Sequence, residues 1–551
     1  MKRRRVLHTM ASLYGAQGLL RNEAHAAAKP QREADLHDPY ADVDWAKCDF
    51  LHSMSHQHTG QTEASRDEFY AMGYRHLAFS NYYPSAPTYP LPQAYLAKHP
   101  DVIGAPNAEQ HSMPDASLHF NSLGSRLATG YGSTLSAAQR NAAPLAHQFD
   151  GLQVFNETRP WAGVYRLDLV LAAVAEGGLA QLTVEGAIEC KFTGQFAPKA
   201  PVHDMPLKAG SHTFYFSTTE PHLHMQLIYD KAQLRVTQCR LMQGANRPWR
   251  EVFRAALDGE IIDGRRTGGL LHADGGGITL NHPTQDRQLY EMFLDFDPRV
   301  LGIEVWNQLT SGFGSSKGFY DDSAGPHLHF YKLWDDLLRT GRRCWGFFVK
   351  DHNTFGRGRN VLLVPNTAGH AADAEVAALR AYRTGAFFGA VSAMAVNEAG
   401  EVVPPYDCST FRFTRIVVRR DADGKAAAVE VAVTGNDSVR RPHVQIRFVT
   451  DQGVALVVDA VQAEFPLQRD ADGQWLAAFV RVEAFAYPDT HLGGEPLTPA
   501  KIRGLNVHDI SLLHDRRSTG GKAHFSSSGG AEIRSRIPIV DMIFSQPLRR
   551  V

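Results

Sequence analysis

The chain has few cysteines and no pattern that would put them to use. Its 551 residues include five cysteines, an odd number with no Cys-x-x-Cys pair, which argues against a zinc ribbon or a thioredoxin-like redox motif. Their scatter along the chain predicts buried free thiols. Cys190 and Cys239 form the one candidate disulfide, because both lie in the same strand-rich segment.

Two further absences narrow the class of protein. No apolar run is long enough to span a bilayer, and the formal net charge is −1 at pH 7. Without an excess of positive charge the chain lacks the field with which proteins hold nucleic acid. We therefore expect no transmembrane segment, no nucleic-acid partner, and a small-molecule or carbohydrate substrate. No pattern in the sequence indicates the oligomeric state.

The N-terminus has the composition of an export signal. Met1 and the basic residues up to Arg5 precede a moderately apolar segment that reaches Leu20, and Ala24-His25-Ala26 then offers small residues in an A-x-A-like order. This pattern predicts a leader or tail over residues 1–42 and export to the periplasm or the exterior. A cytoplasmic location is the alternative, because polar residues weaken the apolar stretch.

A His-x-His pair follows the first short apolar strand. Residues i and i+2 of an extended chain point to the same side, so His56 and His58 can direct two imidazoles at one point, as a shared metal ion requires. The alternative is two surface histidines, since the chain contains 26 histidines. The pair alone is a weak signal, and the residues downstream decide its meaning.

Three later segments also end an apolar strand with a metal-competent side chain. Parallel strands that each deliver one ligand from their carboxyl ends build a site at the opening of a barrel. The predicted ligands are Glu109, His119, His282 and Asp351, together with His56 and His58. His111, two residues after Glu109, is a further candidate.

In this order the segments resemble the PHP (polymerase and histidinol phosphatase) family of metal-dependent phosphoesterases. The resemblance covers roughly residues 47–124 and 265–395. It is carried by His56-Gln57-His58, by Asn281-His282-Pro283, and by the segments 69–79, 302–307, 334–343 and 350–353. It implies an α/β fold, a distorted (β/α)7 barrel that positions a metal centre.

Two positions depart from the family pattern. Where the family usually has Thr-Asp-His after the second strand, this chain has Ser80-Asn81-Tyr82, and its last motif has Asn353 in place of a histidine. Glu63 stands where the family places an acidic residue. A third metal site would therefore lack two histidines, unless His352 replaces one of them.

The resemblance implies a dinuclear centre. His56, His58, Glu109 and Asp351 would hold one divalent ion and Glu109, His119 and His282 a second. Imidazole and carboxylate ligands suit Zn, Mn or Fe, and two such ions can activate water for attack on phosphorus. The residues to which we assign catalytic roles are Asp351, His282, Tyr82 and Arg357. Arg75, Lys350, Arg357 and Arg359 are candidates to hold phosphate charge, with exposed basic turns as the alternative.

The rest of the chain predicts two β-rich domains. Strands with period-two patterning at 161–171, 180–185, 208–216 and 224–229 predict an inserted β-sandwich over residues 125–264, loosely similar to PA14 and carbohydrate-binding modules. It would interrupt the barrel, which takes residues 43–124 and 265–395. After a helix at 374–382, strands at 414–420, 427–433, 443–449 and 454–458 predict a C-terminal Ig-like β-sandwich over residues 396–551.

Two functions follow from these patterns. The first is a metal-dependent hydrolase that cleaves a phosphoester of a small or sugar-linked substrate. The second keeps the barrel but directs it at carbohydrate, as a glycan-cleaving enzyme or a carbohydrate-binding protein, because of the inserted sandwich and the two missing histidines. Metal content and a substrate panel distinguish them.

Overall fold

A computed structural model describes most of the chain after residue 35. The described residues are 36–58, 62–80, 89–110, 113, 115–116, 118–126, 248–262, 265–284, 286–307, 312–314, 328–352, 357–366, 371–393, 411–434, 441–491, 494–515 and 537–551, with the strands between 152 and 243 and residues 208–209. Tyr82, His111, Asn353, Cys408 and the export signal expected before residue 36 lie outside these ranges.

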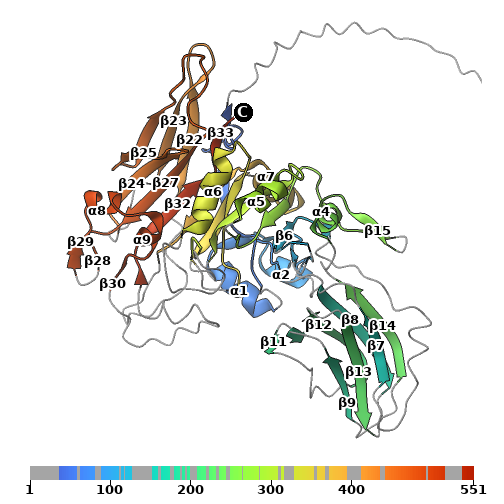
Figure 1. Cartoon of the computed structure of the whole chain (residues 1–551). Coiled ribbons are helices and arrows are strands. Elements are labelled where there is room, and N and C mark those ends of the chain that lie inside the picture. Colours follow the sequence, from blue (N-terminus) through green and yellow to red (C-terminus); the bar gives the residue numbers. More distant parts are fainter. Residues whose placement is uncertain are drawn as a thin grey trace, which may run out of the picture. The chain divides into compact units, whose positions relative to one another are not determined.

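The largest sheet has eleven strands and joins segments from both ends of the chain. The C-terminal strand β33 lies beside the N-terminal strand β1 (Figure 1). The main path of this sheet runs through β1 (Leu36–His37), β33 (Leu548–Arg550), β27 (Phe479–Tyr487), β32 (Asp541–Ser545), β21 (Phe387–Val391), β20 (Gly358–Pro365), β2 (Cys48–Met54), β3 (Tyr74–Leu77) and β4 (Ile103–Gly104). A branch leaves it at β27, which pairs with β24 (His443–Thr450), and β24 pairs in turn with β25 (Gly453–Val458).

The tail expected over residues 1–42 therefore ends earlier than its pattern indicated. Leu36 begins β1, and both Leu36 and Tyr40 are buried. The Tyr40 hydroxyl donates to the Phe387 carbonyl at 2.9 Å. Residues 36–42 thus belong to the packed structure, because this buried hydroxyl and its apolar neighbours hold them there.

A second sheet carries the strands that approach the candidate site. It has five strands in the order β19 (Trp345–Val349), β18 (Val300–Asn307), β17 (Gly277–Leu280), β6 (Phe120–Leu123) and β5 (Glu109–Gln110). The β17–β18 and β18–β19 ladders are parallel. Every residue of β18 is buried, as is typical of a parallel strand covered on both faces.

Backbone hydrogen bonds join the two sheets at both edges. At one edge the Glu109 amide donates to the Ser80 carbonyl at 2.9 Å, just beyond β3. At the other, the Asp351 amide donates to the His56 carbonyl at 3.1 Å, just beyond β19 and β2. The ladders among the described residues form separate open sheets, so the seven-stranded barrel stays a prediction, and these bonds are the places where it would close.

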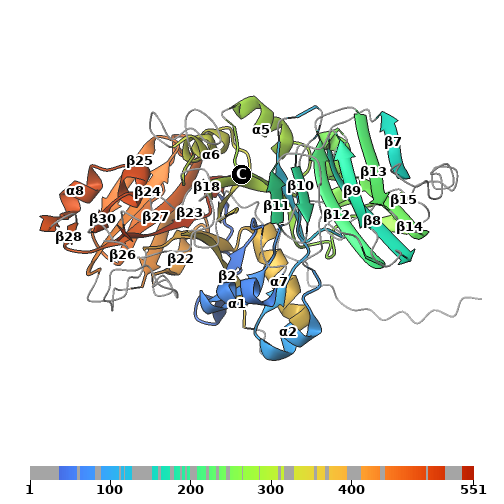
Figure 2. The same ribbon diagram turned by 90° about the horizontal axis from the view of Figure 1, so that it is seen from below.

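Eight helices of the described residues cover these sheets. α1 and α2 lie side by side in both views (Figures 1 and 2). Thr62 caps α1 by accepting from the Ser65 amide, and Asp286 caps α5 in the same way, which satisfies amides that a helix leaves unpaired. The helices are α1 (Glu63–Ala71), α2 (Gln93–Lys98), α4 (Trp249–Leu257), α5 (Arg287–Leu294), α6 (His329–Arg339), α7 (Ala371–Thr384), α8 (Pro499–Arg503) and α9 (Val507–Ser511).

Helix α4 belongs to the main core, although it lies within the segment expected to form the insertion. Trp249 and Phe253 are buried in the same cluster as β17, β18 and α6. The Trp249 amide donates to Asp115 at 2.9 Å, and the Ser125 hydroxyl donates to the Ala256 carbonyl at 2.7 Å. The boundary expected at residue 264 therefore lies beyond a helix that packs with the core.

The inserted segment consists of two antiparallel sheets. The four strands expected there are confirmed as β8 (Gly163–Ala173), β9 (Leu179–Glu185), β12 (Gly210–Thr218) and β13 (His222–Asp230). One sheet has the order β11-β10-β12-β8-β14 and the other the order β7-β13-β9. The added strands are β7 (Leu152–Thr158), β10 (Glu189–Phe192), β11 (Gln195–Pro198) and β14 (Arg235–Gln243), and β15 (Glu260–Ile262) and β16 (Arg265–Thr267) form a separate hairpin.

The strand order rules out the expected disulfide. Cys190 lies on β10 and Cys239 on β14, and two strands separate them. Three interstrand spacings place their backbones roughly 14 Å apart, whereas a disulfide needs Cα atoms within about 7 Å. Cys344 is a buried free thiol, as expected, whereas Cys48 is a free thiol that is only half-buried.

The C-terminal residues form a strand-rich region that is continuous with the first sheet. The strands expected there are confirmed as β22 (Phe413–Arg420), β23 (Ala426–Val433), β24 and β25, and α7 confirms the expected helix. β22, β23 and β26 (Gln462–Pro466) make a three-stranded sheet, and the short pairs are β28 (Thr490–His491) with β29 (Glu495–Pro496) and β30 (His514–Asp515) with β31 (Ile537–Pro538). In the described part of the chain no helix has the length and apolar character to cross a membrane.

Candidate metal centre

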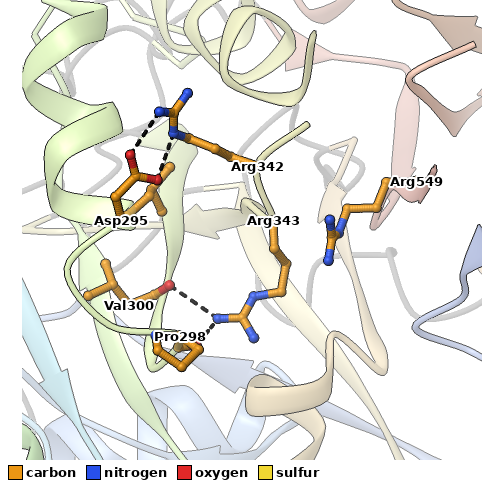
Figure 3. Close-up of a pocket in the computed structure, with 7 residues that line it drawn as sticks. Asp295, Pro298, Val300, Arg342, Arg343 and Arg549 are labelled. Atoms are coloured by element: carbon orange, nitrogen blue, oxygen red, sulfur yellow. Dashed lines mark hydrogen bonds and ion pairs between the residues drawn. The ribbon is translucent and has the colours of Figure 1, made fainter. Parts of the chain in front are cut away.

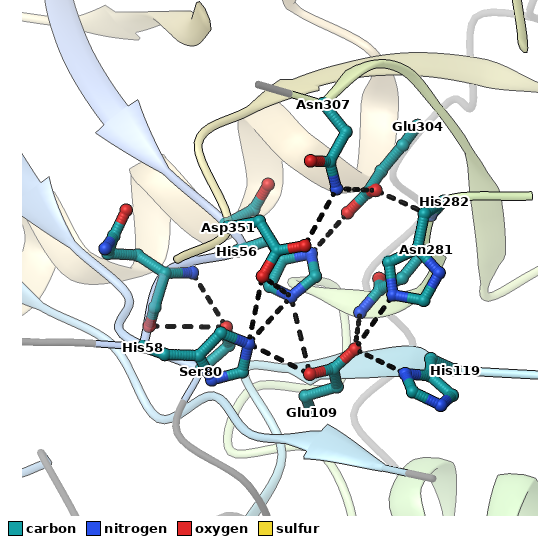
Figure 4. A network of polar contacts seen from close by, with 12 residues as sticks. His56, His58, Ser80, Glu109, His119, Asn281, His282, Glu304, Asn307 and Asp351 are labelled. Atoms are coloured by element: carbon teal, nitrogen blue, oxygen red, sulfur yellow. Dashed lines mark hydrogen bonds and ion pairs between the residues drawn. The ribbon is translucent and has the colours of Figure 1, made fainter. Parts of the chain in front are cut away.

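Four strand ends deliver the predicted ligands to one cluster. His56 and His58 follow β2, Glu109 begins β5, His282 follows β17 and Asp351 follows β19. Figure 4 shows these side chains directed toward one another, with Glu109 in the middle. His119, which precedes β6, approaches the same carboxylate. The six residues that the sequence predicted as ligands are therefore neighbours in the structure.

The two carboxylate oxygens of Glu109 face different partners. Oε2 lies 2.9 Å from His58 Nε2 and 3.5 Å from His56 Nε2. Oε1 lies 3.1 Å from His119 Nδ1 and 3.3 Å from His282 Nε2. The side-chain amide of Asn281 also donates from Nδ2 to Oε1 at 3.0 Å. One carboxylate thus stands between two groups of histidines.

Asp351 completes the side of the cluster that faces His56. Its Oδ1 lies 3.4 Å from both His56 Nε2 and His58 Nε2. His352 Nε2 lies 3.6 Å from the same oxygen, and its ring stacks on His58 with ring centres 4.2 Å apart. The ligand atoms of His58, Asp351 and His352 lie close enough together to share an ion.

Two of these residues have strained backbones. Among the described residues, His282 (φ 21°) and Asp351 (φ 54°) are the two non-glycine positions with positive φ. Such angles are rarely adopted by residues with a Cβ, and they persist where the surroundings hold them. Each lies two residues beyond the end of a strand, so the turn re-aims the side chain into the cluster.

Glu304 supports the centre, and the sequence analysis did not assign it a role. On β18, its Oε1 accepts from His56 Nδ1 at 2.6 Å, and its Oε2 accepts from the His282 amide at 2.6 Å. The side-chain amide of Asn307 donates from Nδ2 to Glu304 at 2.8 Å and to Asp351 at 3.2 Å. A glutamate inside a wholly buried strand was the signal, because a buried carboxylate needs partners.

The buried carboxylates create a strong demand for positive charge. Burial alone would lower the pKa of His56, yet Asp351, Glu304 and Glu109 hold that pKa well above its ordinary value. Burial alone would raise the pKa of Glu109. The charge of His56 and the hydrogen bonds from His119 and His282 instead hold the pKa of Glu109 well below its usual range. The pKa of Asp351 is lowered for similar reasons. The buried carboxylates thus favour a positive charge at this position, whether a proton on His56 or a cation.

His352 behaves differently. Burial, reinforced by the charge on His58, lowers the pKa of His352 to about 3. A neutral imidazole is the form that can act as a metal ligand. His352 could therefore serve the ligand role that the sequence analysis offered as the replacement for a missing histidine.

Histidine and carboxylate groups here could hold a metal ion. The three groups of converging ligand atoms are His56 with His58 and Glu109, Glu109 with His119 and His282, and His58 with Asp351 and His352. Each group offers imidazole nitrogen and carboxylate oxygen, the donors that suit zinc, manganese or iron. The donor set therefore fits a divalent transition metal.

Several other predicted residues lie outside the cluster. Glu63 is exposed on α1 and forms an ion pair with Lys98 at 3.0 Å. Arg75 pairs with Asp101 at 2.6 Å. The Lys350 amine lies 4.8 Å from the centre of the Tyr74 ring. The structure thus places none of these three at the metal ligands.

Arg357, to which we assigned a catalytic role, serves another purpose. Its guanidinium donates to the carbonyls of Ser392 at 2.6 Å, Ser511 at 2.8 Å and Val540 at 3.3 Å. These bonds tie β20 to the C-terminal segments. Because all three nitrogens are engaged with backbone, this arrangement argues against the phosphate clamp we expected. Arg359 bonds the Ser392 hydroxyl nearby.

Comparisons with known proteins add little. No family model and no curated protein matches the chain. Among solved structures it is similar to DesR, a β-glucosidase from Streptomyces venezuelae in complex with D-glucose, at 12% identity with a TM-score of 0.12, over 64% of this chain and 47% of that one. The match thus spans about half the length of that enzyme. A TM-score this low supports no argument about fold or activity.

Proposed function

We propose that the chain is a hydrolase whose centre takes two divalent transition-metal ions, Zn, Mn or Fe, and cleaves a phosphoester of a small or sugar-linked substrate. The observation that carries the proposal is the position of Glu109, whose two oxygens face separate groups of histidines. A carboxylate so placed can bridge a pair of ions. When bound, such a pair activates water and neutralises charge that develops on an oxyanion.

The chain's own groups prepare the site for cations. Glu304 fixes the orientation of His56 and leaves its Nε2 directed at Glu109 and Asp351. Asn281 holds the Glu109 oxygen that faces His119 and His282. Such supporting bonds fix the tautomer and direction of a ligand and raise its basicity. In a distorted barrel, which stays part of the proposal, these side chains would surround one opening.

Elemental analysis of the purified protein tests the metal centre. We expect about two ions per chain, and a clear loss in His58→Ala and Glu109→Ala, because the remaining groups leave an ion under-coordinated. His443→Ala is the matched control, since His443 pairs with Asp489 at 2.7 Å on the C-terminal strands. A protein without metal after reconstitution would contradict the proposal. A count near three would assign an ion to His58, Asp351 and His352.

A substrate panel tests the reaction. We expect metal-dependent release of phosphate from aryl phosphates or sugar phosphates, and none from the Glu109→Ala variant. The second candidate is action on glycans, favoured by the two antiparallel sheets of the inserted segment. Cleavage of glycosides without any cleavage of phosphoesters would replace the first proposal with the second.

A further inference from the structure

A pocket of about 220 Å³ lies away from the metal centre and is rich in arginine. Figure 3 shows that Asp295 adjoins Arg342, that Arg343 reaches Pro298 and Val300, and that Arg549 lies beyond Arg343. Three arginines and one aspartate leave an excess of two positive charges at its lining. Arg343 and Arg549 are half-buried, so their heads are partly open to solvent.

The three arginines differ in how they are paired. Arg342 is neutralised, because its Nε and Nη2 donate to the two oxygens of Asp295 at 2.8 Å each. Arg343 bonds the backbone carbonyls of Pro298 and Val300. Arg549 donates to the Gly341 carbonyl at 3.1 Å. Neither Arg343 nor Arg549 has a carboxylate partner in the described part of the chain.

Both of these guanidinium groups also have donors to spare. The Nε atoms of Arg343 and Arg549 are buried and donate to no acceptor among the described residues. A buried donor without a partner is unfavourable by about 1 to 3 kcal/mol, and such groups in native proteins point to an absent water or ion. Two of them in one pocket make that inference stronger.

The electrostatics of the pocket agree with its geometry. Burial and then the charge of Arg549 lower the pKa of Arg343, and burial lowers the pKa of Arg549. His37 pairs with Arg549 in the β1–β33 ladder, and burial with both arginines lowers its pKa to about 4. His37 is therefore neutral at pH 7, and the charge of Arg549 acts on Arg343 more strongly than the opposing charge of Asp297.

The pocket is distinct from the metal centre. Val300, which lines it, is the first residue of β18, whereas Glu304 and Asn307 at the centre lie further along the strand. Four residues of extended chain separate Val300 from Glu304 by roughly 13 Å. A ligand in the pocket would therefore not contact the metal ligands.

We propose that this pocket binds a small dianion of the phosphate class, either free phosphate or the phosphoryl group of a phosphate monoester. Two unneutralised guanidinium groups match the charge of a dianion, and their planar donors suit its tetrahedral oxygens. A single carboxylate would leave one charge uncompensated. The dianion would bridge β33 to the turn before β19, and so tie the C-terminal strand to the second sheet.

Thermal unfolding of the metal-loaded full chain, titrated with inorganic phosphate at constant ionic strength, tests the proposal. We expect a saturable rise in the melting temperature. Arg343→Gln and Arg549→Gln should each weaken the apparent affinity by roughly tenfold or more. Arg549→Gln is the safer variant for folding, because Arg549 has a single bond to backbone. Arg380→Gln is the control, an exposed arginine paired with Asp274.

The outcomes separate this pocket from other anion effects. An equal rise in both pocket variants would place the phosphate elsewhere, including at the metal centre, and would overturn the proposal. An equal rise with acetate or chloride would show general screening and would also overturn it. Glycerol phosphate identifies the source of the dianion: tighter binding than inorganic phosphate indicates an organic phosphate, and weaker binding indicates free phosphate.

Discussion

Glu304 illustrates how one buried side chain can govern a centre without being a ligand. It accepts from His56, from the His282 backbone and from Asn307, so it holds residues from three different strand ends. Metal-ligating histidines usually donate their second nitrogen to such a group, and its loss lowers metal affinity by about 10- to 100-fold. The role of Glu304 is to position His56.

We predict that Glu304→Gln weakens metal binding by about 10- to 100-fold while the protein stays folded. Glutamine keeps the size of the side chain but removes the charge that favours the correct tautomer of His56. Competition with a chelator measures the affinity. Glu375→Gln is the control, because Glu375 lies 3.3 Å from His272 outside the centre. Equal affinity in wild type and Glu304→Gln would show that the carboxylate only fills space.

The ligands could be predicted from the sequence, but their supports could not. His56 and His58 are adjacent by strand geometry, and Glu109, His282 and Asp351 each end an apolar run. Glu304 interrupts the apolar run of β18, but that pattern does not identify its partners, because the chain must fold before a residue on β18 can meet one that follows β2. Arg357 shows the reverse error: its charge suggested a substrate, and folding directed it to backbone carbonyls.

His76 gives a second prediction at this scale, on pH. It is fully buried, its Nδ1 lies 2.7 Å from the Ser53 hydroxyl, and burial lowers its pKa from the ordinary value of 6.5 to about 3. Since the folded pKa is the lower one, the neutral ring contributes its full stability above pH 6.5. That contribution decreases as the pH falls from 6.5 toward 3, because the unfolded chain binds a proton that the folded chain does not.

We expect this residue alone to account for a loss of about 1 kcal/mol in unfolding free energy between pH 7 and pH 5.5. His76→Gln, which can retain the bond to Ser53, should reduce the shift of the urea midpoint over this interval. Both proteins are measured with and without chelator, so that metal release is separated from the effect. Identical shifts in the two proteins would mean that His76 binds a proton as readily in the folded chain as in the unfolded one.

At the scale of elements, local patterning predicted strands well and their neighbours poorly. From Val429 to Val433, β23 alternates between buried and half-buried residues, and its sequence shows it. Which strand pairs with which depends on distant chain: β32 joins β21 to β27 across more than 50 residues in sequence. The Cys190–Cys239 pairing failed for this reason: the two cysteines lie on β10 and β14, which local patterning did not mark as strands and which are not neighbours in the sheet.

Helix α4 shows a different limit of the sequence. Its buried residues Trp249, Val252, Phe253 and Ala256 recur at helical spacing, so the helix itself is visible in the pattern. The sequence does not show whether α4 belongs to the insertion or to the main core, because the helix follows a run of strands and precedes the resumed barrel motifs. The contacts with β17 and the Ser125–Ala256 bond place it with the core.

At the scale of the whole molecule, the C-terminal region is continuous with the sheets that carry the candidate metal centre and is not a separate domain. On β27, Arg481 is buried and donates to both oxygens of Asp335 on α6, at 2.9 Å and 3.1 Å, and to Glu483 at 2.5 Å. Removing one partner of such a buried pair destabilises a protein by about 3 to 5 kcal/mol. The boundary expected at residue 395 is thus crossed by both a sheet and an ion network.

Unlike the C-terminal region, the inserted segment can be tested as a separate unit. A pair of deletions tests where it begins and ends. Ser125 contacts Ala256, and Pro248 lies eight helical residues before it, so the two ends of the insertion are separated by roughly 12 Å. A linker of eight Gly and Ser residues reaches about 15 Å and can replace residues 128–246. We expect this variant to fold and to keep its metal content.

Deletion of residues 125–264, the segment that the sequence alone suggested, should instead yield insoluble or metal-free protein, because it removes Trp249 and Phe253 from the core. Loss of one large buried aromatic side chain alone destabilises a protein by about 3 to 5 kcal/mol. Solubility, circular dichroism and elemental analysis compare the two deletions with the full chain. If both fold and hold metal equally, α4 is dispensable. If both fail, the strands between 152 and 243 stabilise the sheets that carry the candidate metal centre and are no independent unit.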